Sequence, residues 1–381
     1  MNDIRRAPIK VAEAELDSLR SRIGETRWVE RETVEDWSQG PPLEAMRDLM
    51  DYWRDRYDWR QCEARINAVN PSATHIDGLD IHFLHARSPH ADALPLVITH
   101  GWPGSVAEFL DVIPMLTNPT AFGGRAEDAF HVIAPSLPGY GFSAKPEKAG
   151  WKADRIAHAW IELIQRLGYG ERWAAQGGDW GSVITTLIGC FAPAGLVGVH
   201  TNRPMYRPRP EDREDQGPHF QRMRELDRAY KAEDWGYMQL QKSRPQTIGY
   251  ALVDSPVAQA AWIYEKLWKW TDHDGRPEDA ISRDRMLDNI ALYWLTATGG
   301  SSARLYWEAS GTIANSTLTV DVPSGASIFP GELSFTPREW ASRVLTNIVY
   351  WNEAEKGGHF AAWEQPEIFA REVRACFALM R

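Results

Sequence analysis

Cysteine and long apolar stretches are scarce in this chain of 381 residues, and each scarcity excludes a class of protein. The three cysteines, Cys62, Cys190 and Cys376, lie far apart and include no CxxC pair. They support neither a disulfide framework nor a zinc site, and we expect buried thiols in a reducing compartment. No window approaches the roughly 18 consecutive apolar residues of a membrane span. The polar, basic N-terminus does not resemble a signal peptide, so the sequence predicts a cytoplasmic protein without a membrane partner.

An excess of basic residues is also absent. Lysine and arginine number 42 against 52 acidic residues, which gives a net charge of −10 and argues against a nucleic-acid partner. Neither a P-loop nor a GxGxxG segment that opens a βαβ unit occurs. His82 and His85 lie three apart in strand-like sequence, where they would face opposite sides and could not share a metal ion. We therefore expect no cofactor and no metal.

Tryptophan, in contrast, is abundant, with 18 in the chain and several between Trp235 and Trp307. Indole rings bury large apolar areas and often line pockets for apolar ligands. More than half of these rings are expected in the core, and the remainder suggests a pocket for an apolar or aromatic ligand.

The length suits one large domain with an insertion, or two domains. Helical periodicity over 11–28 and 43–59, with Leu16, Leu19 and Ile23 on one face, predicts an N-terminal extension over residues 1–70. A helix pair has no self-sufficient core, so this extension must pack on the residues that follow.

Strand-like and helical segments then alternate, which predicts an α/β fold with a mostly parallel, doubly wound sheet. Helical, aromatic-rich and charged sequence over 203–306 predicts an inserted helical cap, or lid. The core would comprise 71–202 and 307–381. The predicted strands are 79–86, 94–99, 129–134, 173–176, 196–200, 326–329 and 344–350, and the predicted core helices are 156–167, 182–190 and 366–379.

The most informative segment is Gly-Gly-Asp-Trp-Gly at 177–181, between a short predicted strand and a predicted helix. A nucleophile on a sharp strand-to-helix turn needs small neighbours on both sides. The helix N-terminus that follows favours an anion. Asp179 is therefore the candidate nucleophile, in the position where a serine is usual. The alternative is an ordinary glycine-rich turn with a helix-capping aspartate.

A second segment, His-Gly-Trp-Pro-Gly-Ser, begins at His100 directly after the predicted strand 94–99. In such a fold this segment presents a backbone N–H to a developing oxyanion. The predicted donors are the N–H groups of Trp102 and Trp180, and His100, Pro103 and Trp180 are expected to line the substrate pocket. The alternative is a tight turn that ends a strand.

The order of a catalytic triad in this fold is nucleophile, acid, histidine. His359 is the only histidine after the cap and lies in a loop beyond the last predicted strand, so it is the candidate base. Glu332 follows the preceding strand and is the candidate acid, which would orient the imidazole and stabilise the imidazolium. Asp321 precedes that strand, and Glu353 and Glu355 are expected to be solvated.

An aspartate that attacks an sp3 carbon forms an alkyl ester, which water activated by a histidine can hydrolyse. Epoxides and haloalkanes are suitable substrates. An epoxide oxygen leaves as an alkoxide and needs a nearby acid such as tyrosine. Spacing alone does not select among the candidates of the cap, which are Tyr230, Tyr237, Tyr250, Tyr264, Tyr293 and Tyr306.

Taken together, these motifs resemble the microsomal-type epoxide hydrolases, including their soluble bacterial members, within the α/β-hydrolase superfamily. The resemblance runs along nearly the whole chain. It is carried by segments at 21–28, 100–105, 137–141, 177–181, 243–249, 254–257 and 357–367, whose sequences are SRIGETRW, HGWPGS, LPGYG, GGDWG, SRPQTIG, DSPV and GGHFAAWEQPE. The membrane anchor helix of some members has no counterpart here, which again suggests a soluble enzyme.

The resemblance implies roles for individual residues. Asp179 matches the nucleophile, His359 the base and Glu332 the acid. Tyr237 and Tyr306 match the two tyrosines that protonate the epoxide oxygen, with Tyr306 in an S-x-R-x-Y-x-E pattern that begins at Ser302.

The expected reaction converts an epoxide and water into a vicinal diol, without a cofactor. A second hypothesis is a haloalkane or haloacid dehalogenase, in which the indole N–H of Trp180 would hold the halide. A third is a catalytically inactive binding protein on the same fold, although no triad member is missing from the sequence. The expected partners are an apolar or aromatic epoxide, water and a second copy of the chain in a homodimer.

Overall fold

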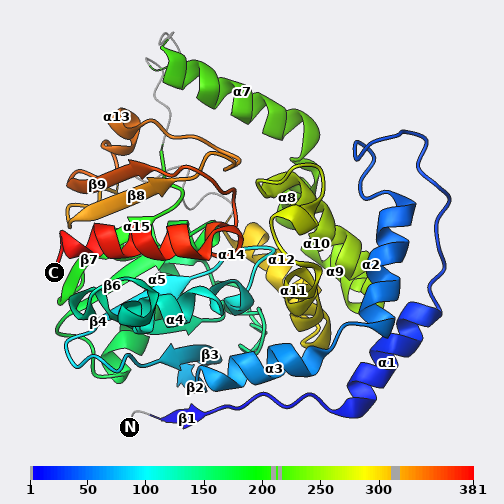
Figure 1. The fold of residues 1–381 in the computed structure, drawn as a ribbon, viewed down its shortest axis with the longest axis horizontal. Coiled ribbons are helices and arrows are strands. Elements are labelled where there is room, and N and C mark those ends of the chain that lie inside the picture. The colour runs from blue at the N-terminus through cyan, green and yellow to red at the C-terminus, as the bar shows by residue number, and fades with distance from the viewer. Residues whose placement is uncertain (1–2, 207–211, 213–216, 310–317) are drawn as a thin grey trace.

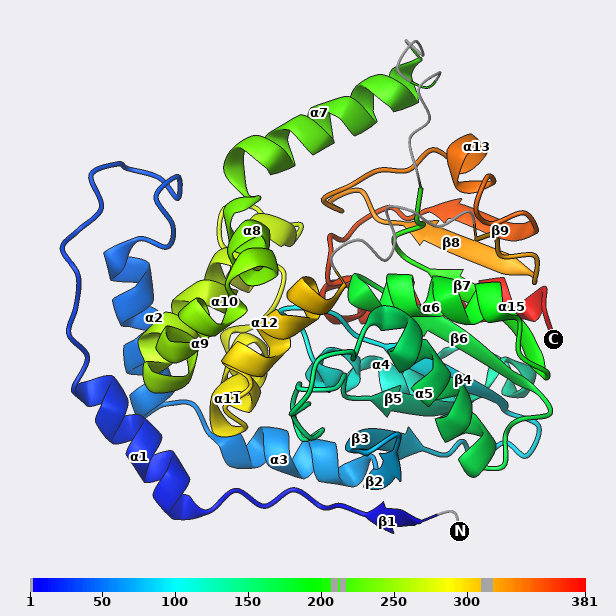
Figure 2. The same ribbon diagram turned by 180° about the vertical axis from the view of Figure 1, so that it is seen from behind.

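A computed structural model describes residues 3–206, 212, 217–309 and 318–381. The described residues form one nine-stranded sheet with helices on both faces, and a group of helices lies beside the sheet (Figures 1 and 2). The doubly wound, mostly parallel α/β architecture predicted from the sequence is thus confirmed.

The strand order in the sheet is β1-β2-β3-β5-β4-β6-β7-β8-β9. The pairs β1–β2, β2–β3 and β3–β5 are antiparallel, whereas every pair from β5 to β9 is parallel. The central strands are apolar on both faces, as expected where helices cover a parallel sheet on both sides. The strands are β1 Ile4–Arg6, β2 Pro71–Ile76, β3 Leu79–Ala86, β4 Leu94–Thr99, β5 Phe130–Pro135, β6 Trp173–Gly177, β7 Leu196–Thr201, β8 Ser324–Ile328 and β9 Ile348–Glu353.

Helices α5 and α6 cover one face of the sheet, and α4 and α15 cover the other (Figures 1 and 2). The carboxyl ends of the parallel strands carry the loops that approach the helical group. The helices outside that group are α1 Glu13–Gly24, α2 Leu43–Asp55, α3 Trp59–Ala68, α4 Val112–Thr117, α5 Ala153–Arg166, α6 Trp180–Phe191, α13 Arg338–Ala341, α14 Ala361–Glu364 and α15 Pro366–Ala378.

Among the described residues, six α-helices follow β7 before the sheet resumes at β8, largely within the stretch predicted to form a cap. α8 to α12 pack beside the sheet, while α7 extends away from them above β8 and β9 (Figure 1). The exact domain boundaries stay a prediction, although α12 continues beyond residue 306, where the cap was expected to end. These helices are α7 Pro218–Glu233, α8 Gly236–Ser243, α9 Pro245–Asp254, α10 Pro256–Trp270, α11 Arg283–Leu295 and α12 Gly299–Glu308.

The N-terminal helices pack against this helical group. α1 contacts α2 and α10, and its predicted apolar face of Leu16, Leu19 and Ile23 is buried. Both ribbon views place α1 and α2 along the flank of α9 and α10 (Figures 1 and 2). The expectation that the extension needs a partner surface is therefore confirmed.

The predicted single helix over 43–59 was wrong. α2 ends at Asp55, and the side chain of Asp58 accepts a hydrogen bond of 2.9 Å from the N–H of Arg60, which starts α3. A capping aspartate satisfies an N–H that the helix cannot, so it begins a new helix. α3 and β2 were both missed, and the last strand lies over Ile348–Glu353 rather than 344–350.

Candidate active site

Asp179 lies on a sharp turn between the end of β6 and the start of α6. Its backbone has a φ of 49° and a ψ of −123°, a conformation that non-glycine residues rarely adopt and that costs energy. The turn presents the carboxylate at the carboxyl edge of the parallel sheet, in front of a helix N-terminus. This is the geometry that the sequence predicted for a nucleophile.

The neighbouring glycines are required by close backbone contacts. A Cβ on Gly177 would lie 2.1 Å from the carbonyl oxygen of Gly181, and a Cβ on Gly181 would lie 1.9 Å from that of Thr99. A Cβ on Gly101 would collide with the Asp179 carboxylate at 2.1 Å. The glycines of both predicted motifs therefore allow β4 and the turn to approach each other.

One carboxylate oxygen of Asp179 lies in the expected oxyanion site. The N–H of Trp102 donates to Asp179 Oδ1 over 2.9 Å. The N–H of Trp180, the other predicted donor, makes no hydrogen bond to this carboxylate within the described residues. Oδ1 is thus held by the backbone, whereas Oδ2 lies near His359 Nε2.

His359 and Glu332 lie beside Asp179, as predicted. His359 Nδ1 is 2.8 Å from Glu332 Oε1, and His359 Nε2 is 3.4 Å from Asp179 Oδ2. The backbone N–H of His359 donates to the carbonyl oxygen of Trp270, and Glu364 accepts the N–H groups of Gly358 and Phe360 on either side of the imidazole. These contacts fix the loop, and the His359 side chain is only 1% exposed.

Burial opposes charge at all three groups, but the partners outweigh it. Burial alone would lower the pKa of His359, and the facing Glu332 and Asp179 carboxylates raise it to about 10. Burial would raise the pKa of Asp179, yet His359, the Arg203 guanidinium and the Trp102 N–H bring it below its usual value. The pKa of Glu332 is likewise lowered by His359 and Arg203 against the effect of burial. The resting arrangement is two carboxylates around an imidazolium.

Tyr237 and Tyr306 both reach this site from the helical group. Tyr237 stacks on Trp102 with ring centroids 4.9 Å apart, and Tyr306 lies edge-on to Trp180 at 5.1 Å. The two tyrosine rings lie 5.8 Å apart. Burial is the main cause that raises the pKa of each hydroxyl well above 10, so both stay protonated over the physiological range.

The packing shows which of the six cap tyrosines reach the site. Tyr230 also reaches the site, and its hydroxyl lies 3.0 Å from that of Tyr237. Tyr264 bonds Glu278, Tyr293 bonds the carbonyl oxygen of Gly104, and Tyr250 is exposed. Tyr230 therefore lies beside Tyr237 and Tyr306, although the sequence did not single Tyr230 out.

A cavity of about 460 Å³ opens above the Asp179 carboxylate. Its walls come from the turn, from the residues after β7, from α7 and α8, from α12 and from the loop after Glu332. The lining is mainly aromatic and apolar, as expected of a pocket for an apolar ligand. The lining residues are Asp179, Trp180, Val183, Arg203, Pro204, Met205, Tyr206, Met223, Asp227, Tyr230, Lys231, Trp235, Tyr237, Met238, Tyr306, Leu333, Ser334, Phe335 and Thr336.

The structure differs from the prediction at two of the three expected pocket residues. Trp180 lines the large cavity, but His100 lines a separate small cavity of about 20 Å³, to which Asp179 also contributes, and Pro103 lines neither. Asn289 binds the carbonyl oxygen of Pro103 over 2.7 Å, which ties this part of the loop to α11 instead.

Two charged residues at the site were missed. Arg203, just after β7, places Nη1 3.7 Å from Asp179 Oδ2. Glu108, in the short helix Val106–Phe109, is buried and lines the small cavity together with Asp179 and His359. Burial raises the pKa of Glu108 to about 8, partly offset by His359. A charged residue directly after a strand end was the signal for Arg203, whereas no sequence pattern pointed to Glu108.

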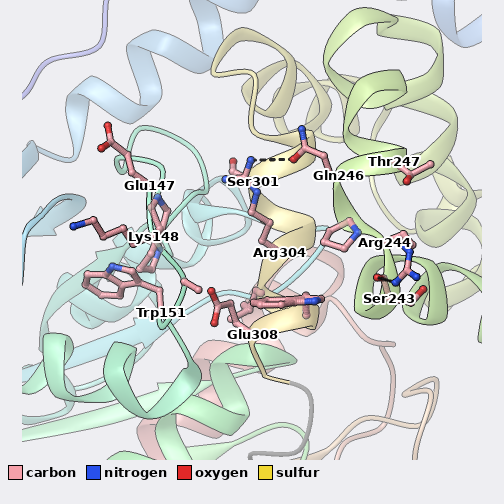
Figure 3. A pocket seen from close by; sticks show the side chains of 16 residues that line it. Glu147, Lys148, Trp151, Ser243, Arg244, Gln246, Thr247, Ser301, Arg304 and Glu308 are labelled. Carbon is pink, nitrogen blue, oxygen red and sulfur yellow. Dashed lines mark hydrogen bonds between the residues drawn. The ribbon is translucent and has the colours of Figure 1, made fainter.

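A further pocket of about 400 Å³ lies beside α12 and is separate from the large cavity (Figure 3). It is lined by Arg304 and Glu308 of the pattern around Tyr306 and by the 243–247 segment, which the resemblance had included. Glu308 accepts the N–H of Gly150 at 2.9 and 3.0 Å, and Ser301 donates to the carbonyl oxygen of Gly139. These contacts anchor α12 to the core loops and so fix Tyr306, which faces the other way.

The remaining predictions concern metals, thiols and membranes. Within the described residues, no group of three or more His, Cys, Asp and Glu side chains could hold a metal ion. His82 and His85 instead bond Ser136 and Tyr169 separately. The cysteines are free thiols, with Cys190 only half-buried. No helix in the described segments is both long and apolar enough to cross a bilayer.

Comparison with known proteins gives two family matches. Residues 4–109 match the family described as epoxide hydrolase N terminus, and residues 95–268 match the alpha/beta hydrolase fold. The chain is 56% identical to a Stigmatella aurantiaca protein provisionally named an epoxide hydrolase, over 98% of this chain and 85% of that protein. It is 35% identical to epoxide hydrolase 1 of Sus scrofa, over 99% of this chain and 89% of the relative.

Two solved structures that resemble this chain are also epoxide hydrolases. Juvenile hormone epoxide hydrolase from the silkworm Bombyx mori superposes with a TM-score of 0.90 at 30% identity, covering 99% of this chain and 94% of that one. Aspergillus niger epoxide hydrolase superposes with a TM-score of 0.88 at 30% identity, covering 99% and 96%.

The sheet, the strand-to-helix turn and these matches define an enzyme of the α/β-hydrolase fold, with the predicted triad residues together at the carboxyl edge of the sheet. Within that fold, the sequence identity to epoxide hydrolases over nearly the whole chain establishes the family. The chain belongs to the epoxide hydrolase family.

Proposed function

We propose that this enzyme hydrolyses an epoxide to a vicinal diol through an ester on Asp179. The observation that carries the proposal is that Asp179, Tyr237 and Tyr306 line one cavity, while Asp179 Oδ1 accepts a backbone N–H. A carboxylate and two phenols are the groups that an epoxide needs, one to attack carbon and the others to protonate oxygen.

In the first step Oδ2 bonds to an epoxide carbon and the carbon–oxygen bond of the ring breaks. Tyr237 or Tyr306 gives its proton to the departing oxygen, and the resulting phenolate recovers a proton from the His359 imidazolium. Oδ1 becomes the carbonyl oxygen of the ester, already next to the Trp102 N–H. The products of this step are the ester, a free hydroxyl on the substrate and a neutral imidazole.

Formation of the ester on Asp179 converts His359 into a base for the next step. The raised pKa of His359 depends on two facing carboxylates, and the ester removes the charge of one of them. The pKa of His359 must then fall, so the imidazole can accept a proton from water. Water attacks the ester carbonyl, the oxyanion forms at Oδ1 beside the Trp102 N–H, and collapse releases the diol and restores both charges.

Incubation with a racemic styrene oxide should yield phenylethanediol, and the enzyme should yield no halide from chloroalkanes. After many turnovers in isotopically labelled water, the label should be found in the Asp179 carboxylate, because the attacking water oxygen stays on the enzyme. A His359→Gln variant should accumulate a mass adduct on Asp179. Diol formation by an Asp179→Ala variant would contradict the proposal.

The finer expectations of the sequence complete the proposal. We propose an apolar or aromatic epoxide as substrate, which the aromatic lining of the cavity supports. A panel of epoxides with aliphatic and aryl substituents, analysed on a chiral column, tests it. The homodimer and the cytoplasmic location are proposals from the sequence, and light scattering of the purified enzyme and cell fractionation test them.

A further inference from the structure

Arg203 is an unusual neighbour for a nucleophile in an otherwise aromatic pocket. It follows β7 at the carboxyl edge of the sheet, the edge at which α/β enzymes bind their ligands. Its Nε donates to Ser334 Oγ over 2.9 Å, which fixes the plane of the guanidinium. Its side chain is nevertheless 32% exposed and lines the cavity above Asp179.

The two Nη groups of Arg203 are available to a ligand. Nη1 lies 3.7 Å from Asp179 Oδ2, too far for a hydrogen bond, and neither Nη group bonds any other described residue. The other cation of the pocket, Lys231, is paired with Asp227. Arg203 is therefore the cation of the described pocket lining whose Nη groups have no hydrogen-bond partner among the described residues.

The geometry points to an epoxide that carries an sp2 oxygen acceptor, a carbonyl or carboxylate oxygen, held by Arg203 while Asp179 attacks. This inference rests on the proposed function and names its substrate class. The attacked carbon must come within about 3.0–3.5 Å of Oδ2. Because Nη1 is 3.7 Å from the same oxygen, an acceptor bonded to Nη1 fits two or three bonds from that carbon.

A matched substrate series tests this inference: phenylglycidate, methyl phenylglycidate and trans-β-methylstyrene oxide place a carboxylate, an ester and a methyl group at one position. The wild-type enzyme should favour at least one acceptor-bearing epoxide over the methyl compound by about 10-fold to 100-fold in kcat/KM, the usual effect of a charge-assisted hydrogen bond. A faster carboxylate identifies an anionic substrate, and a faster ester identifies a neutral one.

Arg203→Met should remove this preference, mainly through KM: kcat/KM for the favoured acceptor-bearing epoxide should fall about 10-fold to 100-fold more than kcat/KM for the methyl compound, which makes no such bond. Arg228→Gln is the matched control, because Arg228 is exposed on α7 and lines no part of the cavity. Equal slowing of all three epoxides by Arg203→Met, or no preference in the wild type, would overturn the inference. Failure of the proposed function would differ, because no epoxide would then give a diol.

A different observation carries a second inference, on the hydrolytic step. The small cavity of about 20 Å³ has room for one water molecule. Its walls include Asp179, His359 and the buried Glu108, whose carboxyl group packs against Gly104 so closely that a Cβ there would lie 1.3 Å from Oε1. His359 Nε2 has no hydrogen-bond partner within the described residues.

We infer that Glu108 is a positioning residue that holds the hydrolytic water between its carboxyl group and His359 Nε2. The substrate occupies the large cavity, so this water would reach the ester carbonyl from the small cavity, which Asp179 also lines. Glu108→Gln keeps one acceptor, whereas Glu108→Leu removes the polar contact altogether.

Rapid-quench mass spectrometry with styrene oxide separates the two steps. Glu108→Leu should form the Asp179 adduct at the wild-type rate but hydrolyse it at least about 10-fold more slowly, and Glu108→Gln should recover part of the loss. Slowing of both steps together by Glu108→Gln, or unchanged hydrolysis in Glu108→Leu, would overturn the inference.

Discussion

The pairing of His359 with Glu332 makes a quantitative prediction. Their 2.8 Å contact places the centres of the two charges about 4 Å apart, where an effective dielectric of about 20 gives an attraction of about 4 kcal/mol. That energy corresponds to a change of about 3 in a pKa. Glu332→Gln keeps a hydrogen-bond acceptor but removes the charge, so the pKa of His359 should fall from about 10 to about 7.

An NMR titration of the His359 ring, assigned by its loss in His359→Gln, measures this pKa directly. The matched control is Asp321→Asn, because Asp321 is the exposed acid that sequence order excluded. Glu332→Gln should also slow ester hydrolysis by about 100-fold, since the imidazolium that forms in that step loses its counter-charge. A His359 pKa that stays near 10 in Glu332→Gln would refute the reasoning.

The same shift affects stability, with a definite sign. A histidine whose pKa is raised in the folded state stabilises the fold fully below its unfolded pKa of about 6.5, and this contribution is lost as the pH rises through about 10. The melting temperature of the wild type should therefore fall more steeply than that of Glu332→Gln between about pH 7 and pH 10.

Three further predictions follow from the contacts around the site. Tyr237→Phe and Tyr306→Phe should each slow ester formation, by about 10-fold to 100-fold in stopped-flow measurements, and the double variant should abolish it; unchanged turnover in the double variant would refute the assigned role. Glu308→Ala should lower kcat because it frees α12 from the core loop, and Glu308→Gln should restore kcat because its amide oxygen can still accept the bond. Lys266→Met should destabilise the fold by about 3–5 kcal/mol in denaturant titrations, because it leaves the buried Asp234 carboxylate without its cation; a loss below about 1 kcal/mol would show that the pair is solvated.

The sequence was most informative where local chemistry allows few solutions. The turn around Asp179 was predictable because only glycines fit at 177 and 181, and the carbonyl contacts in the structure show why. His359 and Glu332 were predictable because chain order and strand ends place them on the same sheet edge. These features depend on backbone geometry and on the order of strands, both of which leave a local trace in sequence.

The remaining features depend on contacts between distant segments, which leave no such trace. Spacing did not separate Tyr306 or Tyr230 from the other cap tyrosines. Only the family resemblance pointed to Tyr306, and the packing of α7 and α12 brings both residues to the pocket. Glu108 sits in a short helix between apolar residues, where its burial follows from the fold. The break between α2 and α3 was missed because the helical pattern continues across it. A single residue, the capping Asp58, starts the new helix there.

The two phenols also bear on the choice between an epoxide and a haloalkane as substrate. A departing halide is a very weak base and takes no proton. A tyrosine hydroxyl therefore cannot assist a haloalkane by proton transfer. A departing alkoxide is intrinsically a stronger base than phenolate, so it can take the proton of a nearby phenol. Tyr237 and Tyr306 are therefore suited to supply the proton that the alkoxide needs. Because only a leaving oxygen needs that proton, the presence of Tyr237 and Tyr306 in one cavity with Asp179 favours the epoxide as the substrate.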